Sequence, residues 1–298
     1  GNPVLSTPDG RRMDEALAGL DCYVAIDFYV NETTRHAHFI LPPTGPLQRP
    51  HYDLALNTLA RRPEYGYGDE VPELVAAATR ALPAWEEQDF VGQVSPTAVE
   101  TIGDEAEARL VAVVDFGLKA NIVRALRARG FRVRIFPHTT DARALLADTP
   151  AGVILSPGPG DPARLAGPVT LARDVIAARV PLLGICLGHQ IIGRAAGAET
   201  RRLSFGHHGA NHPVRDLSSG HVYVTAQNHE VEVIGATLPP ESGFEVSQLN
   251  LNDGSVEGLR HRELPIETVQ YHPEGSPGPL DATPIFDRFA RAIAERAR

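Results

Sequence analysis

The stretch from Leu182 to Ile192 constrains the fold more than any other part of the sequence. An apolar run, Val180 to Ile185, leads to Cys186, and a helical pattern begins at Gly188. A buried strand that runs directly into a helix needs a sharp turn at the residue between them. Gly184 and Gly188 flank that turn, where larger side chains would collide. The spacing Gly-x-Cys-x-Gly is therefore that of a nucleophile elbow with cysteine in place of serine.

The elbow gives Cys186 a chemical environment as well as a position. Positive potential at the amino terminus of a helix favours the thiolate form of a cysteine, which is the nucleophile. We expect the sulfur to be exposed above the edge of the sheet. The alternative is a buried structural cysteine, the ordinary fate of a lone Cys. The flanking glycines and the switch from strand to helix favour the nucleophile.

Strand and helix patterns alternate through residues 110–298, which predicts an α/β domain. Continuous apolar strands with helices between them form a parallel or mixed sheet covered by helices, and ligands bind at the carboxyl ends of its strands. The expected strands cover residues 110–116, 131–136, 152–155, 180–185 and 266–270, and the expected helices cover 120–129, 142–147 and 169–178.

A second strand end carries a stiff, glycine-rich loop, Ser156 to Pro162. Gly158 and Gly160 allow backbone N–H groups to turn toward a ligand, where they could stabilise an oxyanion beside the sulfur. A phosphate-binding loop is the rival interpretation, but it needs a Gly-Lys-Ser/Thr sequence that this loop lacks.

A general base is expected after the strand at 266–270. His272 and Glu274 are two residues apart in an extended segment, so they share a face, and Pro273 fixes the chain between them. A histidine that accepts the thiol proton, oriented by a carboxylate, completes a Cys-His-Glu triad. His189 is closer to Cys186 in sequence, but we expect it to pack against the fold.

Residues from about 70 to 298 resemble the small, glutamine-hydrolysing subunit of carbamoyl-phosphate synthetase, a class I glutamine amidotransferase. The motifs that carry the resemblance are Asp115–Ile122, Leu155–Pro162, Gly184–Gln190, Phe205–Val214, Thr225–His229, His272–Glu274 and Ser276–Pro279.

The resemblance implies roles for particular residues. Cys186 is the nucleophile, His272 the base and Glu274 its orienting acid. The implied reaction releases ammonia from glutamine through a γ-glutamyl thioester and supplies it for carbamoyl phosphate, a precursor in pyrimidine and arginine biosynthesis. The implied partner is a large synthetase subunit that uses ATP and bicarbonate, so no cofactor is expected in this chain. The positions that match glutamine-binding residues are Gly158, Gly160, Leu187, Gln190, Asn228, Glu230 and Val231.

Two departures from the family pattern keep a second interpretation open. After Asn228-His229 the family carries Gly-Phe, whereas this chain has Glu230-Val231, and a carboxylate beside the site would repel the carboxylate of glutamine. From the resemblance, we expect the family's own amino-terminal domain to be missing and an unrelated segment to stand in its place. The alternative function is a catalytically impaired, amidotransferase-like binding module or a truncated fusion product.

The unrelated segment, residues 1–69, resembles a fragment of a molybdopterin-dependent oxidoreductase and is expected to be a small α+β piece. The likeness rests on Gly1–Pro3, Asn31–Ala37 and Ile40–Pro43. No cysteine cluster for iron–sulfur accompanies it, so oxidoreductase chemistry is not expected. Residues 70–109 are read as a linker and entry segment, and residues 110–298 as the amidotransferase domain.

Two groups of histidines raise the question of a metal. His36 and His38 lie two apart on an expected strand, as zinc ligands could, but no third ligand is evident. His207, His208 and His212 look like a metal cluster, and the resemblance makes them structural. We expect no metal site.

Charge and cysteine content narrow the class of protein. A net charge of −9 argues against nucleic acid or an anionic membrane as a partner. Cys22 and Cys186 are the two cysteines, too few and too far apart for a disulfide framework. With no apolar run of about 20 residues, we expect no membrane span and a cytoplasmic location.

Overall fold

The computed structural model describes residues 10–20, 22–26, 34–41, 88–104, 109–275 and 279–296 of the chain. Its contacts divide the chain into two units, Gly1–Pro83 and Ala84–Arg298. The limits expected for the linker, residues 70–109, stay a prediction. The sequence pattern also predicts a helix over residues 71–82, and those residues lie outside the described part of the chain.

The described part of the first unit is small and mixed. Helix α2 (Gly10–Ala18) is followed by strand β1 (Val24–Ile26), a 3₁₀ turn (Thr34–His36) and strand β2 (Phe39–Leu41). The two strands pair in parallel. The likeness of this unit to an oxidoreductase fragment stays a prediction.

The prediction that His36 and His38 lie together on one strand is wrong. His36 lies in the 3₁₀ turn, and its Nε2 is 2.6 Å from Asp14 Oδ1, while His38 precedes β2 and its Nδ1 accepts a hydrogen bond from the Tyr23 amide at 3.1 Å. The turn separates the two rings, because consecutive residues there do not alternate as they do in a strand. The two histidines therefore have separate partners rather than a common ligand face.

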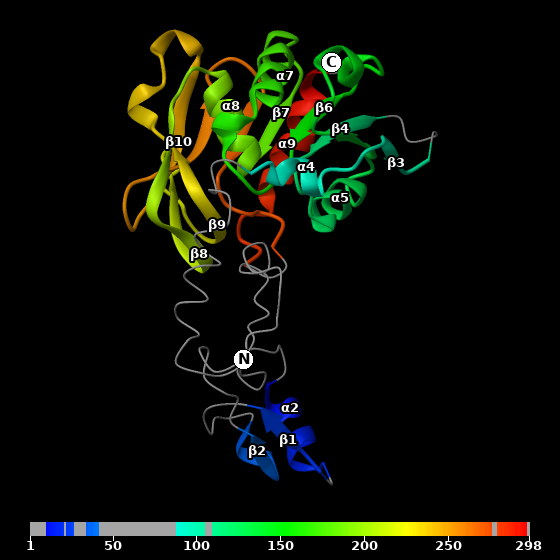
Figure 1. The fold of residues 1–298 in the computed structure, drawn as a ribbon, viewed down its shortest axis with the longest axis vertical. Coiled ribbons are helices and arrows are strands. Elements are labelled where there is room, and N and C mark those ends of the chain that lie inside the picture. Colours follow the sequence, from blue (N-terminus) through cyan, green and yellow to red (C-terminus); the bar gives the residue numbers. More distant parts are fainter. Residues whose placement is uncertain are drawn as a thin grey trace, which may run out of the picture. The chain divides into compact units, whose positions relative to one another are not determined.

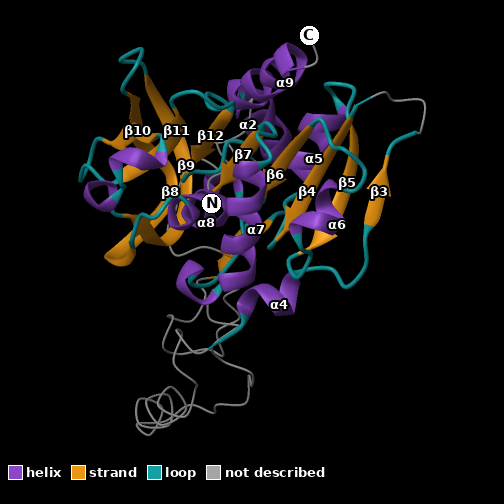
Figure 2. Ribbon diagram, turned by 90° about the horizontal axis from the view of Figure 1, so that it is seen from above, coloured by secondary structure: helices purple, strands orange, loops and turns teal. Residues whose placement is uncertain are grey.

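The second unit is built on one mixed sheet (Figures 1 and 2). The described residues form ten strands in the order β3-β5-β4-β6-β7-β12-β11-β10-β8-β9. Strands β5, β4, β6, β7 and β12 pair in parallel, and every other neighbouring pair is antiparallel. The strands are β3 (Glu100–Ile102), β4 (Leu110–Asp115), β5 (Arg132–Pro137), β6 (Gly152–Leu155), β7 (Leu182–Ile185), β8 (Thr200–Asp216), β9 (Val222–Val233), β10 (Phe244–Asn250), β11 (Val256–His261) and β12 (Ile266–Val269).

Helices cover both faces of the parallel half (Figure 2). They are α4 (Phe90–Val94), α5 (Ala120–Arg127), α6 (Ala142–Leu146), α7 (Ala166–Ala177), α8 (Leu187–Ala195) and α9 (Pro284–Arg296), with a 3₁₀ turn at Pro162–Arg164. Alternate residues of a strand point to opposite faces. In β4, Val111 and Val113 join a core with Ile122 of α5 and Phe286 of α9.

The alternate residues of β4 point to the opposite face of the sheet. Ala112 and Val114 join a second core with Leu171 of α7 and Ile191 of α8. Both cores consist of buried apolar side chains, so the parallel strands are apolar on both faces, as the sequence predicts.

The expected α/β architecture is confirmed, with two corrections. Helix α4 and strand β3 lie within residues read as a linker, where a polar sequence with proline and glycine conceals two short elements. The sequence pattern also did not indicate β8 to β11, because their exposed and buried residues alternate irregularly around bulges. Among the described helices, none has the length and apolarity that a bilayer crossing requires.

Candidate active site

The elbow forms as the sequence predicts. Strand β7 ends at Ile185, helix α8 begins at Leu187, and Cys186 between them has φ 53° and ψ −105°. A positive φ is costly for a residue with a side chain, and such strain persists where the surrounding structure enforces it. The Cys186 amide donates to Val269 O at 2.8 Å, which ties the turn to the end of β12.

The two glycines are required by close backbone contact. A Cβ atom on Gly188 would lie 2.1 Å from the Leu155 carbonyl oxygen, and one on Gly184 would lie 2.8 Å from the Gly188 carbonyl oxygen. The Gly188 amide donates to Ser156 O at 3.2 Å. The elbow is therefore pressed against the start of the glycine-rich loop.

The glycine-rich loop follows β6 and packs against Phe116, the residue after β4. A Cβ on Gly158 would lie 2.3 Å from the Phe116 carbonyl oxygen, and Gly160 has φ 97°. In the described part of the chain, no group accepts a hydrogen bond from the amides of Gly158, Gly160 or Leu187. These are amides of the kind that an oxyanion hole uses.

His272 and Glu274 form the pair that the sequence predicts. His272 Nδ1 lies 2.8 Å from Glu274 Oε1, and the His272 amide donates to Ala226 O of β9 at 2.9 Å. A carboxylate oxygen only accepts, so Nδ1 carries the proton and donates, which leaves Nε2 as the basic atom. Both side chains are buried.

The electrostatics of the pair suit proton transfer with Cys186. Burial lowers the pKa of His272, but the interactions with Cys186 and then with Glu274 outweigh this and raise it to about 9. Burial raises the pKa of Glu274, yet the hydrogen bond to His272 and the positive charges of His272 and Lys119 hold it below its usual value. His272 is thus an effective acceptor for the cysteine proton.

The expectation of an exposed sulfur is wrong. Cys186 is 3% exposed, because β9 and the end of β12 cover it. Its Sγ lies 4.0 Å from Asn228 O and 3.7 Å from Gln270 Nε2. Leu187, another proposed substrate contact, directly follows Cys186 and is the first residue of α8.

Gln190 is used inside the protein. Its Nε2 donates to Val231 O at 2.8 Å and to Gln270 Oε1 at 3.1 Å, and the side chain is buried. These contacts join α8 to β9 and to the end of β12. Val231 is also buried, and Gln270 links Gln190 to Cys186 because its Nε2 lies 3.7 Å from Sγ.

Glu230 does not present an isolated charge. Its Oε2 lies 3.3 Å from Arg202 Nη2, and its Oε1 lies 3.4 Å from His208 Nε2. His208 in turn contacts Asn228 Oδ1 through Nδ1 at 3.1 Å. Attraction to Arg202 across the β8–β9 pair offsets part of the repulsion that the sequence alone suggested.

His189 packs inside the fold, as expected. Its side chain is completely buried, and Nδ1 lies 2.7 Å from Thr268 Oγ1. Burial, reinforced by the nearby His229, lowers the pKa of His189 to about 3. The ring stays neutral and belongs to the core between α8 and β12.

Two contacts of the site were missed by sequence reasoning. Lys119, the only lysine of the chain, has its Nζ 3.1 Å from Glu274 Oε1. Asp115 positions it, because its Oδ1 accepts from the amides of Gly117 and Leu118 just before α5. Gln270 was read only as the end of a strand. The lone lysine within the motif after β4 was the available signal.

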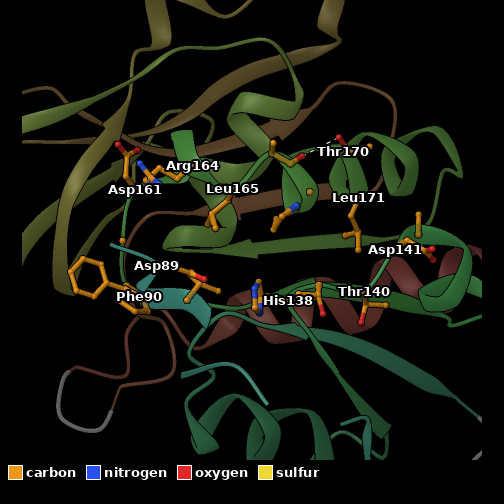
Figure 3. A pocket seen from close by; sticks show the side chains of 18 of the residues that line it. Asp89, Phe90, His138, Thr140, Asp141, Asp161, Arg164, Leu165, Thr170 and Leu171 are labelled. Atoms are coloured by element: carbon orange, nitrogen blue, oxygen red, sulfur yellow. Dashed lines mark hydrogen bonds between the residues drawn. The ribbon is translucent and has the colours of Figure 1, made fainter. Parts of the chain in front are cut away.

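A large cavity lies beside the glycine-rich loop, and Cys186 is not among the residues that line it. It measures about 760 Å³, and its lining includes Pro159, Gly160 and Asp161. Figure 3 shows Asp161, Arg164 and Leu165 on one side of it and Asp89, His138 and Thr140 on the other. The elbow therefore lies against the start of the glycine-rich loop, at Ser156, whereas this cavity lies beside the later residues of the loop, from Pro159 onward.

Comparison with known proteins follows the same residues. A family model described as glutamine amidotransferase class-I matches residues 112–292, which hold the elbow, the glycine-rich loop and the His-Glu pair. The chain belongs to the class-I glutamine amidotransferases. The expected recognition of this family is confirmed, and the second unit is an amidotransferase domain.

Two curated relatives share the name carbamoyl phosphate synthase small chain. The one from Akkermansia muciniphila is 45% identical over 239 residues, covering 76% of this chain and 63% of the relative. The one from Symbiobacterium thermophilum is 45% identical over 207 residues, covering 67% of this chain and 56% of the relative. The chain therefore spans less than two thirds of the length of either relative.

A solved structure supports the fold. A Thermoplasma acidophilum protein that is named as part of a GMP synthase superposes with a TM-score of 0.53 at 25% identity, covering 63% of this chain and 96% of the other. The likeness agrees with the α/β sheet flanked by helices.

Proposed function

We propose that this chain hydrolyses glutamine to glutamate and ammonia through Cys186, His272 and Glu274, and supplies the ammonia to a synthetase partner that makes carbamoyl phosphate. The observation that carries the proposal is the elbow: a cysteine at positive φ, at the amino terminus of α8, beside a histidine oriented by a buried carboxylate.

The first half of the reaction forms a thioester. Nε2 of His272 takes the Sγ proton, and the sulfur attacks the carboxamide carbon of glutamine. The electron pair of the C=O bond moves to oxygen, where the amides of Gly158, Gly160 and Leu187 are available to stabilise the negative charge. The tetrahedral intermediate then collapses, the C–N bond breaks, and His272 returns the proton to the leaving amine, which departs as ammonia.

The second half restores the enzyme. Water attacks the γ-glutamyl thioester while His272 accepts its proton, and the C–S bond breaks to release glutamate and the thiol. Glu274 holds the proton on Nδ1 and stabilises the imidazolium in both halves. Lys119 lies against Glu274 and keeps that carboxylate ionised.

Substrate access requires a movement of the cover. Cys186 is 3% exposed, so a molecule as large as glutamine reaches Sγ only when the segment that carries Asn228 shifts. Asn228, Glu230 and Val231 all lie within four residues of β9, which supports this strand as the side that would hold the substrate. ATP and bicarbonate would be used by the partner, and this chain would need no cofactor.

The name shared by the relatives supports carbamoyl phosphate as the product of the partner. The test is a glutaminase assay of the full chain by itself and with a carbamoyl-phosphate synthetase large subunit. We expect glutamine hydrolysis, together with glutamine-dependent carbamoyl phosphate formation when the large subunit, ATP and bicarbonate are present. Hydrolysis that the partner neither stimulates nor couples to product would contradict the proposed partner.

A second function remains, a binding module that has lost catalysis. The specific observation in its favour is the cover over Cys186, together with the carboxylate of Glu230, which contacts His208 beside Asn228. The same assay separates the two functions, because a binding module would bind the large subunit but release no ammonia.

A further inference from the structure

Three buried ionisable groups meet beneath the β8–β9 pair, outside the proposed triad. His207 of β8, His229 of β9 and Glu257 of β11 are 7%, 6% and 0% exposed. His207 Nδ1 lies 3.2 Å from His229 Nε2 and 3.5 Å from Glu257 Oε1. His208 and His212, which the sequence grouped with His207, do not belong to this set of three in the described residues.

The hydrogen-bond partners assign the protons of both rings. His229 Nδ1 lies 2.9 Å from the Val231 carbonyl oxygen, which only accepts, so Nδ1 of His229 carries a proton. Burial lowers the pKa of His229 to about 3, in spite of that contact with Val231, so the ring is neutral. Its Nε2 is therefore an acceptor, and Nδ1 of His207 must be the donor.

The other nitrogen of His207 is a donor too. His207 Nε2 lies 2.8 Å from Asp253 Oδ2, and a carboxylate only accepts. Burial raises the pKa of Asp253, but its hydrogen bonds with Ser255 and with His207 hold it below its usual value. Both ring nitrogens of His207 carry a proton, so the ring is an imidazolium.

The charge of this imidazolium has a reason in the fold. Glu257 is completely buried, and its oxygens accept from Gln227 Nε2 and Asn250 Nδ2, each at 2.8 Å. A buried carboxylate without a counter-charge is strongly destabilising. The hydrogen bond to Glu257, opposed by burial and aided by Asp253, raises the pKa of His207 to about 8.

Among the described residues, four ionisable groups face the His207 ring. Asp253 lies in the turn after β10, Glu257 on β11 and His229 on β9. His212, on β8 itself, has its ring centroid 5.2 Å away. The two carboxylates favour the charged ring, and His229, which is neutral, does not oppose them.

Strand β9 connects the contacts of His207 to the sulfur of Cys186. His229 stands between Asn228, whose carbonyl lies 4.0 Å from Cys186 Sγ, and Val231, whose carbonyl accepts from both His229 and Gln190. Fixing the His229 ring therefore fixes the strand segment that covers the nucleophile.

We propose that His207 is a positioning residue: as an imidazolium between Asp253 and Glu257, it orients His229 and so holds the Asn228–Val231 segment of β9 over Cys186. The inference rests on the proposed function for its kinetic consequence only. If His207 has this role, glutamine binding depends partly on Asp253, a surface carboxylate that does not contact Cys186 in the described structure.

The same three side chains could be read as a metal site, but their geometry favours the ion pair. A structural zinc site needs four ligands, and the described cluster offers three. Both oxygens of Glu257 are already engaged, and zinc would require Nδ1 of His207 to lose the proton that His229 accepts.

The direct test is a ¹⁵N NMR pH titration of the histidine rings in the full chain, with Asp253→Asn as the variant. We expect His207 to hold both ring protons at pH 7 and to titrate near 8. The variant should lower that pKa by about one unit, because it removes one of two neighbouring negative charges. Titration of His207 near 6.5 in the parent chain would overturn the proposal. So would the stoichiometric binding of added zinc that His207→Gln abolishes.

The kinetic test compares Asp253→Asn with a matched control, Asp216→Asn. Both aspartates hold a serine-containing turn through Oδ1, but only Asp253 contacts His207. We expect Asp253→Asn to raise the KM for glutamine roughly tenfold at pH 8 with a smaller change in kcat, and the control to change neither. In the parent chain KM should rise as the pH passes through about 8.

Equal kinetic behaviour of the two variants would overturn the positioning role. Complete absence of glutaminase activity in the parent chain would refute the proposed function instead, and the NMR titration would still decide the state of His207. Thermal unfolding of each variant at pH 7 checks that the fold is retained.

Discussion

Cys186 lies between two regions that hold it in different ways. On one side, the elbow is fixed by backbone packing: Gly188 against Leu155 and Gly158 against Phe116, with no room for a methyl group. On the other side, the β8–β9 pair is fixed by ionisable side chains, His207, His229 and Glu257. The first depends on shape, and the second depends on protonation.

This difference suggests a division of labour. Close packing of backbone tolerates little displacement, so in the proposed reaction the elbow can hold Cys186 and the amides proposed for the oxyanion hole in place. Hydrogen bonds between side chains can break and re-form, so the β9 side is suited to move when glutamine enters. A change in the elbow should therefore damage the fold or kcat, whereas a change in β9 should act mainly on KM.

The largest expected effect is on stability at the elbow. Gly188→Ala should destabilise the domain by about 3 kcal/mol, because overpacking commonly costs 1–3 kcal/mol and here the new Cβ meets a carbonyl oxygen at 2.1 Å. Chemical denaturation of the second unit measures this. Gly167→Ala in α7 is the matched control, since a Cβ there meets nothing within 4 Å. Equal stability of the two variants would show that the elbow has space the structure does not reveal.

The second-largest effect is expected on kcat, when the proposed general base is replaced. His272→Asn should lower kcat by roughly 10²-fold or more, because a general base typically contributes that much. Glu274→Gln should lower kcat less, since Glu274 orients the ring and does not itself take the proton from sulfur. Steady-state glutaminase kinetics give both values. His189→Asn serves as the comparison, and a greater loss of kcat there than in His272→Asn would mean that the wrong histidine was assigned.

The smallest effect is expected on the β9 side. The double change Glu230→Gly with Val231→Phe should lower the KM for glutamine by up to about tenfold, the equivalent of about 1.4 kcal/mol, and leave kcat nearly unchanged. The ion pair of Glu230 with Arg202 sets the upper limit, because part of the charge is already compensated. The initial-rate dependence on glutamine concentration measures it. An unchanged KM would show that Glu230 does not face the substrate.

The two regions also differ in how far the sequence predicts them. The elbow, the glycine-rich loop and the pairing of His272 with Glu274 depend on residues two to six positions apart, so local spacing contains the information. The contact of His207 with Glu257 joins two strands about 50 residues apart. The contact of Lys119 with Glu274 joins two strand ends at an even greater separation, and no local pattern predicts it.

The burial of Cys186 was missed for the same reason. Local spacing places a sulfur at a strand-to-helix turn, but the cover comes from Asn228 of β9 and from Gln270, which directly follows β12, and both are distant from Cys186 in the sequence. The charge of Glu230 was likewise judged without Arg202, which reaches it from the neighbouring strand. Exposure and charge compensation are properties of the tertiary structure, whereas the turn itself is a property of its glycines.

The central claim, that Cys186 is the nucleophile of a glutaminase, is tested most directly by labelling the full chain with a glutamine-analogue electrophile. Mass spectrometry locates the adduct. Cys22 is the internal control, because it is the other cysteine, free and exposed. We predict modification of Cys186 although it is buried, protection by glutamine, and loss of the adduct in Cys186→Ala. Modification of Cys22 alone, with Cys186 unreactive and glutamine without effect, would contradict the claim.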